Sequence, residues 1–319
     1  MKPKILFVRE KWAGTPADGL SDGDGMVRCF ESLKLGEAIY FYYDEWMNAN
    51  GNQKPDAAVM SLWSREKPDL VMFTHLLQIG ERNVSKSIYE MMRTTSKVIG
   101  VWHEGVAPDV VRVADEHADC VDFNLFLDTQ DQFLIHSKRP EKCFGLYDPR
   151  DSTVFFGDKR ARDIPVSFLG TLLRRPDRCR GIYSLLMSGV PVATITGTRG
   201  FGQLGQQGYA DILRRSLIAI NFSDAANFRH YKGRVAEACL CGAMLMELEN
   251  PETPKIMKEY VNYVPFANEK ELFDKTIYYL QHEQERTAIA ESGMKTAKEK
   301  LDGREFWKAV FEKVRIAVE

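Results

Sequence analysis

This sequence of 319 residues lacks long apolar runs. No stretch approaches the roughly 18 to 20 apolar residues that are needed to span a bilayer. The apolar run at residues 5–8 is too short for the core of a signal peptide, and charged residues follow it at once. We therefore expect neither an export signal nor a membrane-spanning segment.

An excess of charge is also missing, and cysteine is sparse. The chain has 43 Lys and Arg against 45 Asp and Glu, which gives a net charge of -2. This balance excludes a global electrostatic attraction to nucleic acid or to an anionic membrane. Of the six cysteines, only Cys239 and Cys241 lie close together, and their spacing is not that of a zinc site. Such cysteines are typical of reduced thiols and indicate a cytoplasmic protein.

What the first half does contain is a regular alternation of short apolar runs and amphipathic segments. Strand patterns lie at 4–8, 38–43, 69–74, 98–102 and 121–127. Helical patterns lie between them at 26–33, 55–65, 83–93, 108–116 and 130–137. This alternation predicts parallel βαβ units covered by helices, and we predict one doubly wound domain over residues 1–148.

A polar stretch at about 148–165 interrupts the alternation, which then restarts. Strand patterns follow at 166–170, 191–195, 217–222 and 243–247, and helical patterns at 176–188, 208–215 and 234–241, before long C-terminal helices. The predicted fold class is therefore α/β, with two Rossmann-like doubly wound domains. We place them at 1–148 and 149–303, with a final helical segment at 304–319. Two such units favour a ligand site in a cleft between them.

The segment YKGRVAEACLCG, residues 231–242, carries the clearest chemical signal. A glycine stands on each side of its predicted helix. A helix that begins beside Lys232 and Arg234 offers unpaired N–H groups and a partial positive charge, which a phosphate prefers. Glu237, one turn further along, can accept hydrogen bonds from a ribose diol. A surface ion pair between Arg234 and Glu237 explains the same residues equally well, so both interpretations stay open.

The segment resembles the donor-binding turn of GT-B glycosyltransferases. It is most similar to the spore-maturation-protein (CgeB)-like branch of the group 1 family, in which a KGRxFEAxAxG turn precedes an acidic loop. The similarity covers about 166–301, including VSFLGTLLRRPDRCRGI and YADILRRSLIAINFS, while the first half is similar only in layout. The resemblance implies two domains facing a cleft. It also implies transfer of a sugar from a nucleotide-diphosphate sugar, UDP or GDP above all, to an acceptor hydroxyl, with no cofactor and no obligatory metal.

The resemblance also implies roles for residues of the second half. Glu237 aligns with the glutamate that holds the nucleotide ribose, and Lys232 and Arg234 lie where cations face the diphosphate. Gly170 lies where the first strand of the donor domain ends. Four arginines follow it, of which we expect the third to contact a phosphate and at least two to form a solvated basic surface: Arg174, Arg175, Arg178 and Arg180.

One position departs from the family pattern. Many retaining members carry a first glutamate eight positions before the second, and this chain has Arg229 there. The acid pair is therefore incomplete, which weakens the expectation of a retaining reaction and leaves the stereochemistry open. Arg229 or His230 is a candidate contact to the phosphate or the sugar instead.

A glycine-rich loop follows the first predicted strand. Gly23 and Gly25, at a predicted helix start, allow backbone N–H groups to approach a diphosphate, although this signal is weak. Asp22 and Asp24 flank Gly23 and spell the metal-binding D-x-D pattern of the other glycosyltransferase architecture. Because the loop follows the first strand of a doubly wound domain, we favour a turn over a metal site.

Two histidines of the first half follow predicted strands at the carboxyl end, where α/β sites are built. His103 and Glu104 lie at a position that resembles the acceptor-side histidine of related transferases, so we predict a base or a sugar contact. A buried or capping histidine is the alternative. His75 is a weaker candidate of the same kind. The helix at 304–318 has an apolar face and either packs back on the first domain, as the family implies, or covers the second.

The acceptor stays open from sequence alone. A saccharide, a lipid-linked glycan, a protein and a modified DNA base are all compatible with the pattern. The incomplete acid pair also motivates a rival from another class, a nucleotide-binding protein without catalysis on the same scaffold. A glycoside hydrolase is disfavoured because no pair of acids can be assigned across a sugar site.

Overall fold

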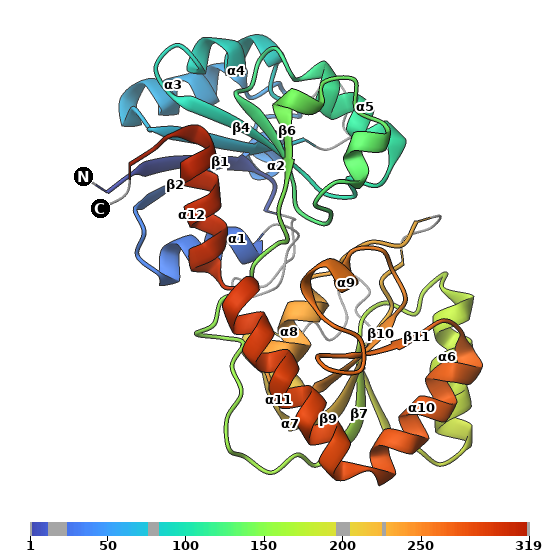
Figure 1. Cartoon of the computed structure of the whole chain (residues 1–319). Coiled ribbons are helices and arrows are strands. Elements are labelled where there is room, and N and C mark those ends of the chain that lie inside the picture. Colours follow the sequence, from blue (N-terminus) through green and yellow to red (C-terminus); the bar gives the residue numbers. More distant parts are fainter. Residues whose placement is uncertain (1, 12–23, 76–82, 196–204, 225–227, 318–319) are drawn as a thin grey trace. The chain divides into compact units, whose positions relative to one another are not determined.

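The structure is a computed structural model that describes residues 2–11, 24–75, 83–195, 205–224 and 228–317. The chain forms two compact units, shown in Figure 1. Among the described residues, unit 1 comprises 2–11, 24–148 and 303–317, and unit 2 comprises 149–302. The chain therefore leaves unit 1 after Asp148 and returns to it after Asp302.

Unit 1 contains a six-stranded parallel sheet in the order β2-β1-β3-β4-β5-β6. Its strands are β1 (Lys4–Arg9), β2 (Glu37–Tyr42), β3 (Leu70–Thr74), β4 (Lys97–Trp102), β5 (Phe123–Phe126) and β6 (Cys143–Gly145). Val8 pairs with Phe73 and Thr74 pairs with Val101, so the carboxyl ends of β1, β3 and β4 lie next to one another. These central strands are buried almost throughout, as in sheets covered on both faces.

The helices of unit 1 are α1 (Asp24–Ser32), α2 (Tyr43–Ala49), α3 (Asp56–Glu66), α4 (Lys86–Met92), α5 (Pro108–Glu116) and α12 (Gly303–Val314). The helix predicted at 130–137 is wrong: only a short 3-10 helix, η2 (Gln132–Ile135), forms there. The hydroxyl of Thr129 accepts the N–H groups of Asp131 and Gln132 and thereby forms a local turn. A second 3-10 helix, η3 (Pro140–Lys142), leads into β6. Helix α2 was not predicted because its aromatic start continues a strand-like composition.

Unit 2 contains a five-stranded parallel sheet in the order β11-β10-β9-β7-β8. Its strands are β7 (Ile164–Leu169), β8 (Val192–Ile195), β9 (Ser216–Asn221), β10 (Met244–Leu248) and β11 (Val264–Phe266). Its helices are α6 (Pro176–Met187), α7 (Gln206–Arg215), α8 (Arg234–Leu240), α9 (Thr253–Ile256), α10 (Glu269–Gln281) and α11 (Glu283–Lys300). The two elements that the sequence did not predict, β11 and α9, are too short to show a period.

The connection from α8 to β10 is a tight left-handed turn. Gly242 has φ +74, a conformation that favours glycine, and its N–H donates to the carbonyl of Cys239 at 2.9 Å. Ala243 then donates to Ala238 at 3.1 Å, and β10 starts at the next residue. Helix α8 is thereby held beside the middle of the sheet of unit 2.

Helix α12 completes the core of unit 1. Figure 1 shows it beside α1, although the two helices lie at opposite ends of the chain. Trp307 is 1% exposed and packs against Phe7 and Phe30, with its ring centroid 6.2 Å and 4.9 Å from theirs. Its indole N–H donates to the carbonyl of Met26 at 2.8 Å. The helix ends at Val314, earlier than the predicted 318, where the next residue takes φ +58.

Two parallel sheets flanked by helices confirm the predicted α/β fold class. Among the described residues, none of the helices combines the length and the apolar character that crossing a membrane requires.

The packing of α12 generates a stability prediction. We expect Trp307→Ala to lower the unfolding free energy by about 3–5 kcal/mol, because it removes a buried indole and leaves a cavity. Chemical denaturation followed by circular dichroism measures the change. Lys308→Ala on the exposed side of the same helix is the control, and a loss of similar size there would contradict the assignment of Trp307 to the core.

Candidate functional site

Three of the residues predicted to bind the donor lie in unit 2 near the carboxyl ends of its strands. Gly170 directly follows β7, and Arg234 opens α8. A Cβ atom at Gly170 would lie 3.1–3.2 Å from the guanidinium of Arg234. Because glycine has no side chain, the guanidinium can occupy this space. Glu237 follows one turn along α8. The structure thus places Gly170, Arg234 and Glu237 around one end of a single helix.

The guanidinium of Arg234 is fixed by two neighbours. Its Nη1 donates to Oδ1 of Asn221 at 2.9 Å, and its Nε donates to the hydroxyl of Tyr209 at 3.2 Å. Asn221 is the last residue of β9, and Tyr209 lies on α7. A cation held in this way needs little reorganisation when an anion binds beside it.

Glu237 is buried and forms an ion pair with Arg150. Oε1 of Glu237 accepts from Nε of Arg150 at 2.6 Å. The surface ion pair between Arg234 and Glu237 is therefore the wrong interpretation of these residues. A buried carboxylate is costly unless a charged or hydrogen-bonding partner compensates it, and Arg150 supplies that partner.

A second buried carboxylate, Glu247 of β10, lies behind Asn221. Its Oε2 accepts from Nδ2 of Asn221 at 2.8 Å, and its Oε1 accepts from Nδ2 of Asn250 at 3.0 Å and from the hydroxyl of Ser223. Burial raises the pKa of Glu247 to about 8 in spite of these donors. Asn221 therefore links Arg234 to Glu247 in one buried polar network.

Arg178, predicted as a phosphate contact, braces two loops. It is buried on α6, and its Nε and Nη2 donate to Oδ1 of Asp224 at 2.9 Å and 2.5 Å. Its Nη1 also donates to the carbonyl of Thr171 at 3.2 Å. The loop after β7 is thereby attached to the loop after β9. Of its neighbours, Arg175 lies 3.9 Å from Asp224, and Arg180 pairs with Asp177 and Glu269.

The remaining candidates of unit 2 lie between β9 and α8. Arg229 is exposed, and its Nη1 donates to the carbonyl of Glu249 at 3.2 Å. His230 is buried, and its backbone N–H donates to Ser223 at 3.1 Å. Lys232 is half-buried one residue before Gly233. These three residues lead the chain from the strand end into the first turn of α8.

In unit 1, His103 and Glu104 follow β4 as predicted. His103 is half-buried, and its Nε2 is buried without a hydrogen-bond partner in the part of the chain that the structure describes. Glu104 is exposed in a turn with φ +61, and its carbonyl accepts from Ala107 at 2.8 Å. Asp128 accepts the N–H of Gly105 at 2.9 Å and holds the turn.

His75 lies at the end of the adjacent strand β3. Its ring centroid is 5.8 Å from that of Trp102 and 4.8 Å from that of His117. Burial and, to a smaller extent, the nearby imidazole of His117 together lower the pKa of His75 to about 4. His75 is therefore neutral at pH 7 and offers hydrogen bonding rather than positive charge.

Glu10, which directly follows β1, was missed by the sequence analysis. It is 3% exposed, and its Oε2 accepts from the hydroxyl of Tyr43 at 2.8 Å and from the hydroxyl of Thr74. The sequence feature that could have identified Glu10 is the position of an acid directly after a strand of apolar residues. Since β1, β3 and β4 are neighbours, Glu10, His75 and His103 follow three adjacent strand ends.

The glycine-rich loop lies only partly within the described residues. Gly23 and Asp22 lie outside the described residues, as does the side chain of Asp24. Gly25 is buried in the first turn of α1. Within the described ranges, no group of three or more His, Cys, Asp or Glu side chains is arranged to hold a metal ion.

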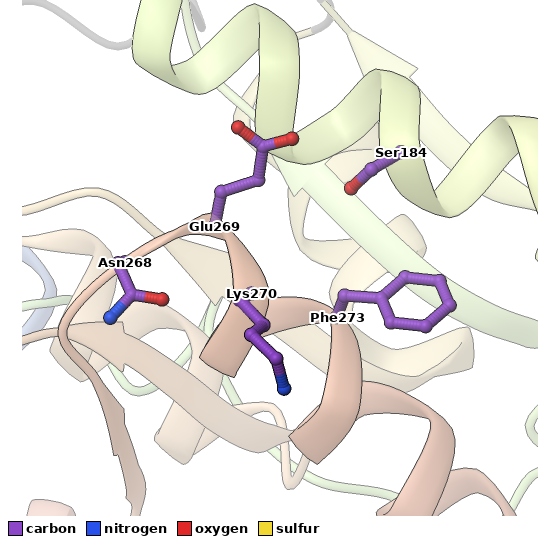
Figure 2. A pocket seen from close by; sticks show the side chains of 5 residues that line it. All are labelled: Ser184, Asn268, Glu269, Lys270 and Phe273. Atoms are coloured by element: carbon purple, nitrogen blue, oxygen red, sulfur yellow. The ribbon is translucent and has the colours of Figure 1, made fainter.

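Figure 2 shows a surface pocket of about 420 Å³ between α6 and α10 in unit 2. It is lined by Ser184, Asn268, Glu269, Lys270 and Phe273. The side chain of Asn268 caps α10 by accepting the N–H of Glu271 at 3.0 Å. None of the predicted donor residues lines this pocket, so we do not assign it to the donor.

The network around Glu247 generates a pH prediction. Its pKa rises from an ordinary value of 4.5 to about 8 on folding, so between these values the folded state keeps a proton that the unfolded chain has lost. Its contribution to the unfolding free energy therefore falls as pH rises from 4.5 to about 8, and levels off above. We expect Glu247→Gln, which mimics the protonated acid, to flatten this slope in denaturation at several pH values. Glu249→Gln, at an exposed neighbour, should leave the slope unchanged.

Comparison with known proteins adds a family match for the second half of the chain. Residues 159–307 match the family described as "Glycosyl transferase-like". No curated protein matches the chain. The matched residues contain Gly170, Arg234 and Glu237.

Solved structures share the whole fold. Anabaena HepE in complex with UDP and glucose is 12% identical, with a TM-score of 0.67 over 99% of this chain and 100% of that chain. An alpha-glucosyltransferase in complex with UDP-glucose and DNA containing an abasic site is 9% identical, with a TM-score of 0.65 over 97% and 98%. A glycosyltransferase from Rickettsia africae is 9% identical, with a TM-score of 0.64 over 99% and 100%.

At these identities the likeness establishes the fold. The solved neighbours are GT-B glycosyltransferases, and the family match adds the enzyme class. Residues 159–307 therefore form a glycosyl transferase-like domain within a chain of GT-B fold, which confirms the predicted class of enzyme, a glycosyltransferase.

Proposed function

We propose that this glycosyltransferase moves a sugar from a UDP-sugar to a hydroxyl group of an acceptor. The observation that carries the proposal is the placement of Arg234 and Glu237 beside Gly170 at the strand ends of unit 2. The solved structure of HepE is a complex with UDP and glucose, and that of the alpha-glucosyltransferase is a complex with UDP-glucose. In this proposal residues 149–303 bind the donor, and residues 1–148 with 304–319 bind the acceptor.

The donor diphosphate lies beside Arg234 in this proposal, with Lys232 as a second cation. The diphosphate gains negative charge as its bond to the sugar breaks, so a fixed cation lowers the barrier of that step. Arg234 suits the role because Asn221 and Tyr209 already hold its guanidinium. Gly170 leaves room for the guanidinium of Arg234, and Arg178 keeps the following loop in place.

Glu237 accepts hydrogen bonds from the hydroxyl groups of the ribose. Arg229, at the position where many retaining relatives carry glutamate, contacts the sugar or a phosphate from the loop before α8. On the acceptor side, the unpartnered Nε2 of His103 accepts a hydrogen bond from the attacking hydroxyl. Glu104 contributes a sugar contact beside it. Gly25, together with Gly23, which lies outside the described residues, is assigned to binding of the diphosphate in this proposal.

The finer assignments rest on the resemblance to the spore-maturation-protein-like branch. They are retention of configuration at the transferred sugar, a reaction without an obligatory metal, and a place in the cytoplasm. The six free cysteines suit a reducing compartment. A saccharide, a lipid-linked glycan, a protein or a modified DNA base supplies the acceptor hydroxyl.

Glu237→Gln tests the donor site. We expect the variant to bind UDP about tenfold or more weakly, because a charged acceptor of the ribose hydroxyls is lost while the shape is kept. Isothermal titration calorimetry with UDP measures the affinity. Glu299→Gln, at an exposed position of α11, is the control. Equal affinity of Glu237→Gln and the unaltered protein would refute the ribose contact.

Slow hydrolysis of UDP-glucose separates an enzyme from a protein that only binds nucleotides. Water can replace the unknown acceptor, so we expect release of UDP by the purified protein, also in the presence of EDTA. Arg234→Met should lower the rate by roughly a hundredfold or more, the typical loss when one group that stabilises developing charge is removed. Tight binding of UDP-glucose without any release of UDP would favour the non-catalytic rival.

A further inference from the structure

Arg150 lies in the segment that joins the two units and is not among the residues that were predicted to form the site. It is the second residue of unit 2, yet its side chain reaches α8, 87 residues further along the chain. The Nε–Oε1 distance to Glu237 is 2.6 Å, and the two side chains are 12% and 5% exposed. This charge pair is therefore shielded from water and from salt far better than a surface pair.

The place of Arg150 is fixed on several sides. Its Nη1 donates to the carbonyl of Pro149 at 3.0 Å. Its backbone forms a parallel bridge with Asp302, the last residue of unit 2 before the chain returns to unit 1. Both segments that cross between the units are thereby joined at Arg150.

Gly233 is shaped by the same arginine. Its backbone has φ −53 and ψ −20, an ordinary helical conformation that any residue adopts. A Cβ atom there would lie 1.6 Å from Nη2 of Arg150 and 2.3 Å from its Cζ. The glycine of the KGR segment is therefore required by the guanidinium that lies against it, not by the backbone.

We propose that Arg150 is the positioning residue of the nucleotide site: it fixes the carboxylate of Glu237 in the orientation that accepts the ribose 2′-hydroxyl. The inference rests on the proposed function, in which Glu237 binds the ribose. Arg150 gives the buried carboxylate a charged hydrogen-bond partner and limits it to one rotamer. A carboxylate held in this way distinguishes a nucleotide with a 2′-hydroxyl from one without it, because the missing hydroxyl leaves a buried acceptor unpaired.

Binding of UDP and of 2′-deoxy-UDP, measured by calorimetry, tests this role. We expect the unaltered protein to prefer UDP by tenfold or more. Arg150→Met should reduce the ratio of the affinity for UDP to the affinity for 2′-deoxy-UDP to near one. Gly233→Ala should do the same, because the new Cβ displaces the guanidinium of Arg150. Arg150→Lys should keep part of the preference, since it keeps the charge without the Nε donor.

A double variant and a control separate positioning from a general loss of stability. Arg150→Met together with Glu237→Gln should show the same ratio as Glu237→Gln alone, because in this proposal Arg150 affects the nucleotide only through that carboxylate. The double variant also removes both buried charges, so it carries the test if Arg150→Met alone does not fold. Arg162→Met is the matched control. Arg162 is another arginine of this segment, and it anchors the far end of α8 through the carbonyl of Cys241 at 2.9 Å.

The outcomes are distinct. A preference for UDP that persists in Arg150→Met, or that Arg162→Met lowers equally, would overturn the positioning role while leaving the proposed function standing. A preference that is absent from the unaltered protein would also overturn it. Failure of the unaltered protein to bind UDP at all would refute the proposed function itself. The inference is supported if Arg150→Met and Gly233→Ala lose the preference for UDP over 2′-deoxy-UDP while Arg162→Met keeps it.

Discussion

The candidate donor site depends on the pairing of polar groups at the strand ends of unit 2. Glu237 and Glu247 are buried, Arg234 is half-buried, and each has a specific partner. A buried charge such as that of Glu237 would cost several kcal/mol if it were left unpaired. The partners therefore determine where α8 starts relative to β9 and β10. The position of α8 in turn determines where the residues that are proposed to contact the ligand lie.

The two units carry different chemistry at their strand ends. In unit 2 the groups are guanidinium cations and carboxylates, which suit a negatively charged nucleotide. At the described strand ends of unit 1 they include His75, kept neutral by burial, the hydroxyls of Tyr43 and Thr74, and the acids Glu10 and Glu104. Such groups can form hydrogen bonds with a hydroxyl-bearing acceptor. This contrast agrees with the roles proposed for the two units and was not evident from the net charge of the whole chain.

Much of the fold was predictable from sequence because parallel strands and amphipathic helices leave strong local patterns. Helix α5 has the predicted bounds, and the predicted strands correspond to observed ones within a few residues. Gly170, Arg234 and Glu237 were identified by their place after a strand or within a recognised turn. The partners of these residues were not, because each contact joins residues far apart in the chain. Arg150 lay in a segment that resembled a polar linker, and nothing local connects it to Glu237.

The same limit applies to single residue types. Gly233 was interpreted as a residue before a helix, whereas its neighbour in space explains it. Arg178 was predicted as a phosphate contact, and the structure adds that its hydrogen bonds connect two loops. Charge and spacing single out an arginine as a candidate for a site, while only the packing shows which groups of the protein it contacts.

The position of α12 has a consequence for the order of folding during synthesis. Met26 and Trp307 are 281 residues apart, so the core of unit 1 lacks its last helix until all of unit 2 has left the ribosome. Unit 2 is a continuous segment among the described residues from 149 to 302 and can close its own core first. The part of the chain that is made first is therefore the last to be completed, and in the meantime its exposed apolar surface is open to chaperones.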